Sequence, residues 1–144
     1  MSLRVALAVV GIGVLVTAAP VAAHHSFAAK YDGTKPITLR GTISRMIWGN
    51  PHGHLYIDAK RPDGEVVTWD LELGGAAALY RRGWRKPDLP IGANVTVQGY
   101  LAKDGTASAN ATVVRLADGR ELFAGSPGTG APGEPPAEDA APRQ

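Results

Sequence analysis

Apolar and polar residues alternate in short runs between positions 37 and 123, which is the pattern of half-buried β-strands. In the first and longest run, Ile37, Leu39, Gly41 and Ile43 share one face, and Ile47 resumes that parity. Gly41 predicts a bend or bulge inside this strand. The five runs cover residues 37–48, 54–59, 67–73, 95–101 and 109–114, and a short extension follows through residues 122 and 123.

Turn-forming residues separate these runs. Residues 49–51 (Gly-Asn-Pro) follow the first run, Asp63-Gly64 predicts a hairpin after the second, and Asp104-Gly105 divides the fourth from the fifth. The segment between the third and fourth runs has a different character. Residues 76–79 are helix formers, and Gly83 is well placed to end a short helix.

The predicted order is therefore three strands, one short helix and two strands. This is the order of the OB-fold, a five-stranded and partly open barrel. We expect an all-β protein with a five-stranded OB-fold-like barrel and one short helix between strands 3 and 4. An unclosed β-sandwich is the alternative, and the position of the single helix favours the barrel.

The two ends of the chain differ from this middle part. Residues 1–23 have the features of an export signal: Arg4, an apolar stretch over residues 5–17 and then small residues. Cleavage after Ala23 places Val21 and Ala23 at the −3 and −1 positions and makes His24 the first residue of the mature chain. The alternative is a retained membrane anchor, for which the apolar stretch is short. We expect a periplasmic or secreted protein.

Composition sets the remaining bounds. Residues 24–124 are expected to form one OB-fold-like domain, with Phe27 and Tyr31 anchoring a polar lead-in. Residues 125–144 are rich in Gly, Pro and Ala and predict a disordered tail. The chain has no cysteine, so neither a disulfide nor a cysteine-linked lipid anchor can form. The formal net charge is only +2.

Several short motifs occur along the chain in a recognisable order: His24-His25-Ser26-Phe27, Gly41-Thr42-Ile43, Asn50-Pro51-His52, Arg81-Arg82-Gly83-Trp84, Gly99-Tyr100, Lys103-Asp104-Gly105 and Leu122-Phe123-Ala124-Gly125. Together they resemble an uncharacterised family of small exported bacterial proteins, catalogued as a domain of unknown function. The resemblance covers nearly all of the chain after residue 23 except the tail. It implies a periplasmic or secreted single-domain protein and brings no catalytic residues with it.

All four histidines lie in two groups, His24-His25 and His52-Gly53-His54. An N-terminal histidine offers its α-amine and its ring to one metal ion, and a third nitrogen would complete a copper site of the histidine-brace type. His52 and His54 share a strand face about 6.6 Å apart, so both rings can converge on one ion. Zinc with three or four imidazoles is also compatible, and copper is preferred.

A structural interpretation of the same histidines competes with the metal site. His24 and His25 would be solvated at a frayed terminus, His52 would brace the turn after Pro51, and His54 would be a polar residue on an exposed face.

Three further groups are candidates for function. Trp48, Tyr56 and Trp84 are candidates for lining a ligand groove beside His52. The cations around Trp84 (Arg81, Arg82, Arg85 and Lys86) can contact nucleic acid, but export and the small net charge disfavour this, and they are better explained as the end of a helix. The carboxylates Asp58, Asp70 and Glu72 are best explained as solvated strand faces rather than as acid–base catalysts.

No nucleophile motif or phosphate-binding loop is visible, so an enzyme is not expected. The sequence predicts an exported binding protein with a copper or zinc site at His24, His52 and His54, and His25 as a possible fourth ligand. The alternative is a non-metal module that binds a periplasmic partner protein or a small ligand through the barrel face. Neither nucleic acid nor a stable membrane anchor after cleavage is expected.

Overall fold

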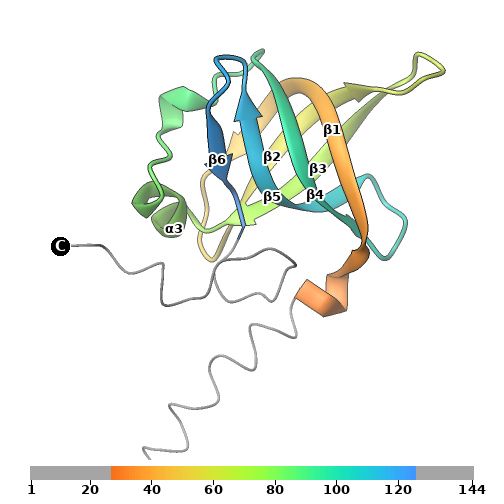
Figure 1. Ribbon diagram of the computed structural model, residues 1–144, viewed down its shortest axis with the longest axis horizontal. Helices are drawn as coiled ribbons and strands as arrows, with labels where there is room; N and C mark the ends of the chain where they lie inside the picture. Colours follow the sequence, from red (N-terminus) through yellow and green to blue (C-terminus); the bar gives the residue numbers. More distant parts are fainter. Residues whose placement is uncertain (1–26, 126–144) are drawn as a thin grey trace, which may run out of the picture.

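The computed structural model describes residues 27–125, which form a β-protein with a few short helical segments beside the sheet (Figure 1). The predicted all-β class is confirmed. The predicted signal segment, His24, His25 and residues 126–144 lie outside the described part. The elements are β1 (Tyr31–Ile47), β2 (His52–Lys60), β3 (Val66–Gly74), α3 (Ala76–Arg81), the 3₁₀ turn η1 (Lys86–Asp88), β4 (Asn94–Ala102), β5 (Ser108–Leu116) and β6 (Glu121–Phe123).

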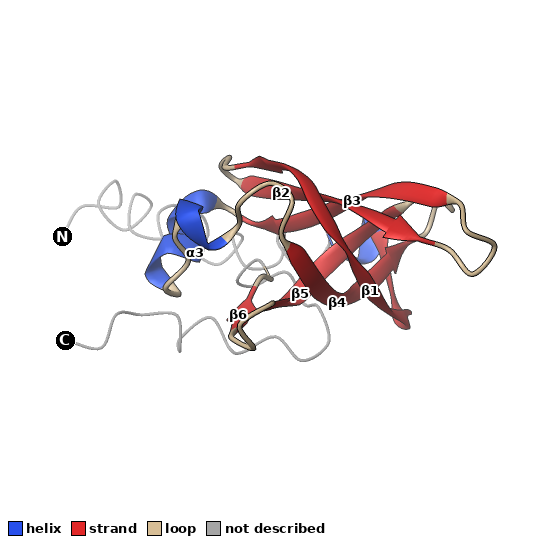
Figure 2. Ribbon diagram, turned by 90° about the horizontal axis from the view of Figure 1, so that it is seen from above, coloured by secondary structure: helices blue, strands red, loops and turns tan. Residues whose placement is uncertain are grey.

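The six strands pair in the order β3-β2-β1-β4-β5-β6, and these neighbours are antiparallel. One further pairing, between β3 and β5, is parallel and joins Asp70 to Ser108 and Glu72 to Asn110. The sheet is strongly curved (Figure 2), and β1 is long enough to pair with β4 along its first part and with β2 along its second. The curvature separates an enclosed inner face from an outer face.

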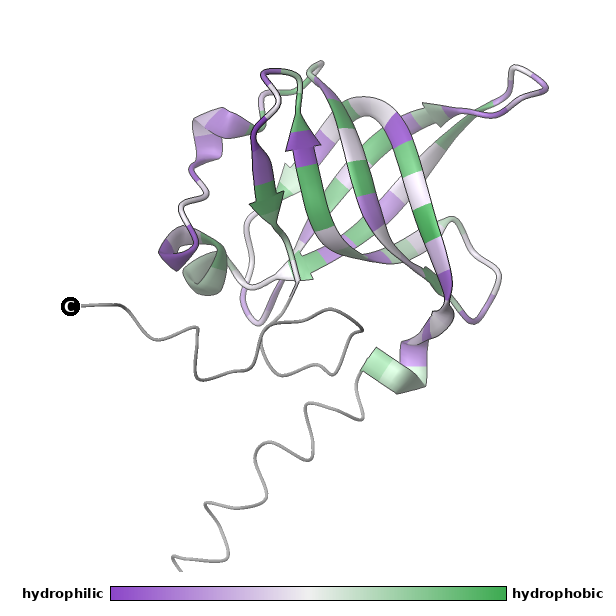
Figure 3. Cartoon of the chain, viewed as in Figure 1, coloured by the Kyte–Doolittle hydropathy of each residue, from purple (hydrophilic) through white to green (hydrophobic). Residues whose placement is uncertain are grey.

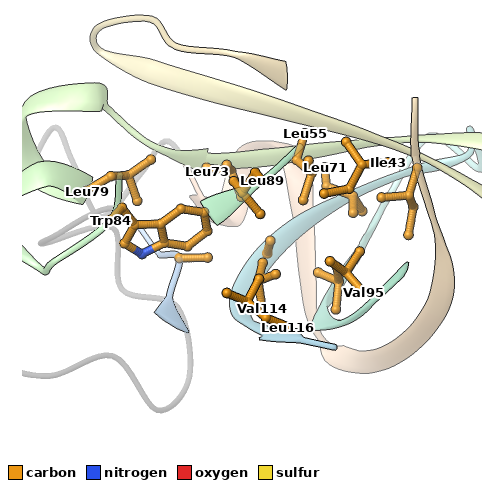
Figure 4. Close-up of a cluster of buried hydrophobic side chains, with 14 of the residues drawn as sticks. Ile43, Leu55, Leu71, Leu73, Leu79, Trp84, Leu89, Val95, Val114 and Leu116 are labelled. Carbon is orange, nitrogen blue, oxygen red and sulfur yellow. The ribbon is translucent and has the colours of Figure 1, made fainter. Parts of the chain in front are cut away.

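The alternation predicted from the sequence is visible along the strands (Figure 3). The inner face holds one large cluster of buried side chains, among which Ile43, Leu55, Leu71 and Leu73 are at most 1% exposed. These side chains point toward one another from different strands, with Trp84 at one end of the cluster (Figure 4). Burial of this apolar surface is the main stabilising contribution to the fold.

The bulge in β1 lies three residues beyond its predicted place. Ile43 pairs with Ile57 but Arg45 pairs with Tyr56, so the intervening residue of β1 is extra. An extra residue reverses the parity of the strand, and Met46 rather than Ile47 packs against the core. The expectation that Ile47 faces inward is therefore wrong, and its side chain is 42% exposed.

Gly41 has a different role from the predicted bulge. A Cβ atom at this position would lie 2.6 Å from the backbone oxygen of Asp58, which is closer than van der Waals contact allows. Glycine is therefore required for the close approach of β1 to β2 where β1 changes from one pairing partner to the other.

Helix α3 ends where the sequence predicts, and its end delivers Trp84 to the core. Gly83 adopts φ +94°, its N–H donates to Tyr80, and the Trp84 N–H donates to the carbonyl of Leu79. These two bonds define a Schellman motif, which satisfies the last carbonyls of a helix. The indole N–H of Trp84 donates to the Phe123 carbonyl at 2.9 Å, so the ring closes one end of the core. Within residues 27–125, no helix has the length and hydrophobicity needed to cross a membrane.

The start of the described chain folds back onto the outer face. Residues 27–30 form one helical turn, and Phe27 and Tyr31 are 6% and 2% exposed in a second small cluster with Ala102 and Tyr100. The Phe27 ring contacts the Tyr31 ring at 5.7 Å and the Tyr100 ring at 5.9 Å. The expectation that Phe27 and Tyr31 anchor the lead-in is confirmed.

Candidate functional site

His52 and His54 both project from the outer face of β2. The residues between and after them, Gly53 and Leu55, are buried, and successive side chains of a strand point to opposite faces. The loop before β2 fixes the start of the strand, because the Asn50 side chain accepts a hydrogen bond from the Ala77 N–H at the start of α3. The two imidazoles therefore share one surface, as the sequence predicts.

Carboxylates of the neighbouring strand β3 contact both imidazoles. His54 Nδ1 lies 2.8 Å from Asp70 Oδ1, and His52 Nδ1 lies 3.2 Å from Glu72 Oε1. Both contacts are diagonal, because the residue directly opposite His52 is Gly74 and the residue opposite His54 is Glu72. The absence of a side chain at Gly74 leaves the His52 ring room to lean toward Glu72.

Glu72 also receives the N-terminal lead-in. Its Oε2 accepts hydrogen bonds from Lys30 Nζ at 2.7 Å and from the Tyr31 hydroxyl at 2.8 Å. Burial alone would raise the pKa of this carboxyl. The hydrogen bonds from Lys30 and Tyr31, with the charges of Lys30 and His52, lower the pKa more, so the net pKa is below its ordinary value. Glu72 is therefore an anion that joins the lead-in to His52.

The pKa values of both donors to Glu72, Tyr31 and Lys30, are raised. Burial raises the pKa of the Tyr31 hydroxyl, and its hydrogen bond to the Glu72 carboxylate adds to the increase. For Lys30, burial acts to lower the pKa, but the hydrogen bonds to Glu72 and Tyr31 outweigh it and the net pKa rises. The lysine is thus held as a cation and the tyrosine as a neutral donor.

Tyr56 and Arg45 complete the outer side of the site. The Tyr56 ring stacks with the His54 ring at 6.4 Å between centroids, and its hydroxyl lies 3.4 Å from Asp70 Oδ2. The Arg45 guanidinium lies 3.9 Å from the Tyr56 ring centroid. Of the two carboxylates, Glu72 is thus paired with the cation of Lys30, and Asp70 with His54 and the Tyr56 hydroxyl.

This arrangement orients the two imidazoles. A carboxylate beside Nδ1 favours the tautomer in which Nδ1 carries the proton, and the lone pair then lies on Nε2. Metal-ligating histidines are commonly held by carboxylates in this way. Within residues 27–125, no group of three or more His, Asp or Glu side chains converges to hold a metal ion. The described part thus supplies two oriented imidazoles, and His24 and His25 lie outside it.

The predicted groove of Trp48, Tyr56 and Trp84 does not form as one surface. Trp84 is 0% exposed, so its assignment as a groove residue is wrong: the Schellman motif of α3 turns the ring into the core. Trp48 packs on Trp84 and Tyr80 at 6.3 and 5.7 Å, whereas Tyr56 contacts His54 and Arg45.

The cations near Trp84 bind the protein's own backbone. Arg82 donates to the carbonyl of Gly125 and lies over the Phe123 ring, and Arg85 donates to the carbonyls of Tyr80 and Trp84. The interpretation of this cluster as part of a helix end agrees with these contacts. Gly125 is itself buried, so ordered structure extends one residue into the predicted tail.

The sequence interpretation missed the carboxylates as partners of the histidines. Alternation had placed Asp70 and Glu72 on an outer face, but as solvated residues. The sequence did contain a signal for these contacts. The hairpin at Asp63-Gly64 makes strands 2 and 3 neighbours, and the outward-facing residues of both strands then lie on the same face of the sheet. Asp58, the third candidate, accepts a hydrogen bond from the Thr68 hydroxyl at 2.6 Å and contacts no histidine among the described residues.

Comparison with known proteins gives one family. A family model described as a family of unknown function (DUF6152) matches residues 11–111, which confirms the expected resemblance to an uncharacterised family. No curated protein and no solved structure matches the chain. The match runs from before the lead-in to the middle of β5 and therefore includes both histidine pairs and both carboxylates.

Proposed function

We propose a function from the site itself, because the chain belongs to a family of unknown function, DUF6152. The protein binds a metal ion, copper in preference to zinc, through the imidazoles of His52 and His54. The N-terminal histidine produced by signal cleavage, His24, supplies further nitrogen ligands, and His25 is a possible fourth ligand.

The observation that carries this proposal is the pair of histidine–carboxylate contacts. Two histidines at i and i+2 on one strand face each have Nδ1 beside a carboxylate, Asp70 at 2.8 Å and Glu72 at 3.2 Å. Two solvated histidines would need neither contact. Holding both rings with Nε2 outward lowers the conformational entropy lost when an ion binds.

The position of the lead-in supports a contribution from the N-terminus. Lys30 and Tyr31 contact the same carboxylate that His52 contacts. Residues 27–30 form a helical turn, and the three residue steps from Phe27 back to His24 can span up to about 10 Å. A shared site requires the α-amine and ring of His24 to reach His52 within that distance. A site with two or three imidazoles and one amine is rich in nitrogen, which favours Cu(II) over Zn(II).

The fold and the location belong to the same proposal. The parallel β3–β5 pairing supports closure of β1 to β5 into an OB-fold-like barrel in the strand order 1-2-3-5-4. The apolar segment at residues 5–17 and the small residues before His24 support export to the periplasm or beyond the cell.

The experiment is a titration of the mature protein, beginning at His24, with Cu(II) and Zn(II). We expect one Cu(II) per chain with an affinity tighter than micromolar, and weaker binding in His52→Ala and His54→Ala. One extra residue before His24 is expected to weaken binding without abolishing it. Asp58→Asn is the matched control, because it neutralises a carboxylate on the same face of β2 that contacts neither histidine. Unchanged binding in the double histidine variant would contradict the proposal.

A further inference from the structure

We infer that the other end of the outer face is a second binding site, for a small ligand that carries oxyanion groups. A cavity of about 420 Å³ lies there, lined by residues of β1, β2, β4 and β5. Ligand pockets commonly have volumes of about 300–1,000 Å³. The cavity wall contains three cations, Arg40, Lys60 and Arg115, and one carboxylate, Asp58.

The three cations are exposed and come from three different strands, β1, β2 and β5. Arg40 of β1 is paired with Thr96 of β4, and Thr96 is paired with Arg115 of β5. On the other side of β1, the pairing with β2 ends at Thr42 and Asp58. Lys60 lies two residues beyond Asp58 on the same face of β2, at the wall of the same cavity.

The salt bridges formed within residues 27–125 involve neither Arg40 nor Lys60. Arg115 is paired with Glu121, and the Asp58 carboxylate accepts the Thr68 hydroxyl. Within the described residues, Arg40 and Lys60 therefore lack a carboxylate partner at the wall of the cavity.

Neutral donors beside the cations complete an anion site. The Thr42 hydroxyl lies 3.0 Å from Asn94 Oδ1, so the Asn94 oxygen is already used and its amide N–H groups are available to a ligand. Thr96 adds a hydroxyl between Arg40 and Arg115. Arginine, lysine, amide and hydroxyl donors together suit phosphate, sulfate or carboxylate oxygens. Val95 and Leu116 also border the cavity, and their side chains belong to the buried core beneath it.

The anion site is separate from the proposed metal site. His52 opens β2 and Lys60 ends it, so eight residue steps of extended strand, about 26 Å, separate them. Binding of an oxyanion here needs no metal, and the two sites can be tested independently.

The test is isothermal titration of the metal-free mature protein with inorganic pyrophosphate and with citrate, at low ionic strength. We compare the wild type with the double variant Arg40→Ala/Lys60→Ala. The matched control is Arg81→Ala/Lys86→Ala, which removes one exposed arginine and one exposed lysine outside the cavity wall. We expect both probes to bind the wild type and the control alike, and the cavity variant about tenfold or more weakly, because two charge-assisted contacts are lost.

Thermal unfolding of the same proteins shows whether a loss of binding is caused by a loss of folding. Neither Arg40 nor Lys60 forms a salt bridge among residues 27–125, so the cavity variant is expected to melt at the same temperature as the wild type or above it. Three outcomes overturn the inference: no heat of binding with either probe at about 1 mM, equal binding by the cavity variant, or binding only to phosphatidylglycerol vesicles, which would indicate a membrane surface. Loss of probe binding with an unchanged or raised melting temperature supports it.

Discussion

Replacement of Glu72 by glutamine tests whether this carboxylate ties the N-terminal lead-in to the sheet. The substitution keeps the volume of the side chain but removes its charge and one acceptor oxygen. Glu72 accepts from Tyr31 at 2.8 Å and from Lys30 at 2.7 Å, and it lies 3.2 Å from His52. A glutamine oxygen can still accept from Tyr31 and Lys30, but it carries no charge, and the amide nitrogen of glutamine cannot accept a hydrogen bond from His52 Nδ1.

The size of the effect follows from the exposure of each partner. Tyr31 is 2% exposed, and a hydrogen bond from a buried donor to a charged acceptor contributes about 1.5–3 kcal/mol. The Lys30 side chain is 49% exposed, so its ion pair contributes at most about 1 kcal/mol. Glutamine retains one neutral hydrogen bond of about 1 kcal/mol. The expected loss is therefore about 2 kcal/mol of unfolding free energy, or roughly 10 °C in melting temperature for a domain of this size.

The assay is urea unfolding at pH 7, repeated at decreasing pH. Glu65→Gln is the matched control, because Glu65 also pairs with a cation, Arg61, but its side chain is 59% exposed. The control is expected to lie within about 0.5 kcal/mol of the wild type. A loss below about 0.5 kcal/mol in Glu72→Gln would refute the assignment of Glu72 as the link between the lead-in and β3.

The pH dependence has a definite sign. The pKa of Glu72 is lower in the folded protein than in the unfolded chain, so the unfolded chain takes up the proton more readily as the pH falls. Its contribution to stability is complete above the unfolded pKa, near 4.5, and is lost as the pH falls through the folded value. The difference in unfolding free energy between the wild type and Glu72→Gln should therefore be largest at pH 7 and should decrease progressively in acid. A difference in unfolding free energy that stays constant down to about pH 2 would contradict this pH dependence.

Three further substitutions test separate parts of the account. Tyr31→Phe removes only the buried hydroxyl and is expected to cost about 1–2 kcal/mol in urea unfolding, whereas Tyr80→Phe, at a ring that is 41% exposed, should cost less than about 0.5 kcal/mol. Asp70→Asn is expected to weaken Cu(II) binding about 10- to 100-fold with little change in stoichiometry, and an affinity equal to the wild type would remove Asp70 from the site. Gly41→Ala places a Cβ 2.6 Å from a backbone oxygen and should cost about 1–3 kcal/mol; a melting temperature equal to the wild type would show that the strands separate without cost.

Alternation along the chain was sufficient to predict the strands and their buried faces. Leu55, Leu71 and Val97 are buried where the pattern places them inward. The pattern failed in the second half of β1, where the bulge after Ile43 reverses the parity. A bulge depends on how β1 meets two different partners, and that information lies in residues far along the chain rather than in the local pattern.

Only part of the site could be predicted from the sequence, because the remaining contacts also depend on how distant strands pair. Parity alone placed His54 on the outer face and paired it with His52. The contact of His52 with Glu72 depends on the register that sets Gly74 opposite His52. The contact between Tyr31 and Glu72 joins residues 41 positions apart, and a one-residue shift of either strand would remove it. Such contacts follow from the assembled sheet, which single-strand periodicity does not specify.

The most direct test of the proposed function is the identity of the atoms around bound copper. X-ray absorption and electron paramagnetic resonance of the Cu(II)-loaded mature protein should give at least three nitrogen ligands, including imidazole. His52→Ala and His54→Ala should each change the spectrum by one imidazole, and Asp58→Asn should leave it unchanged. A spectrum that is the same in the wild type and in both histidine variants would contradict a metal site built on β2.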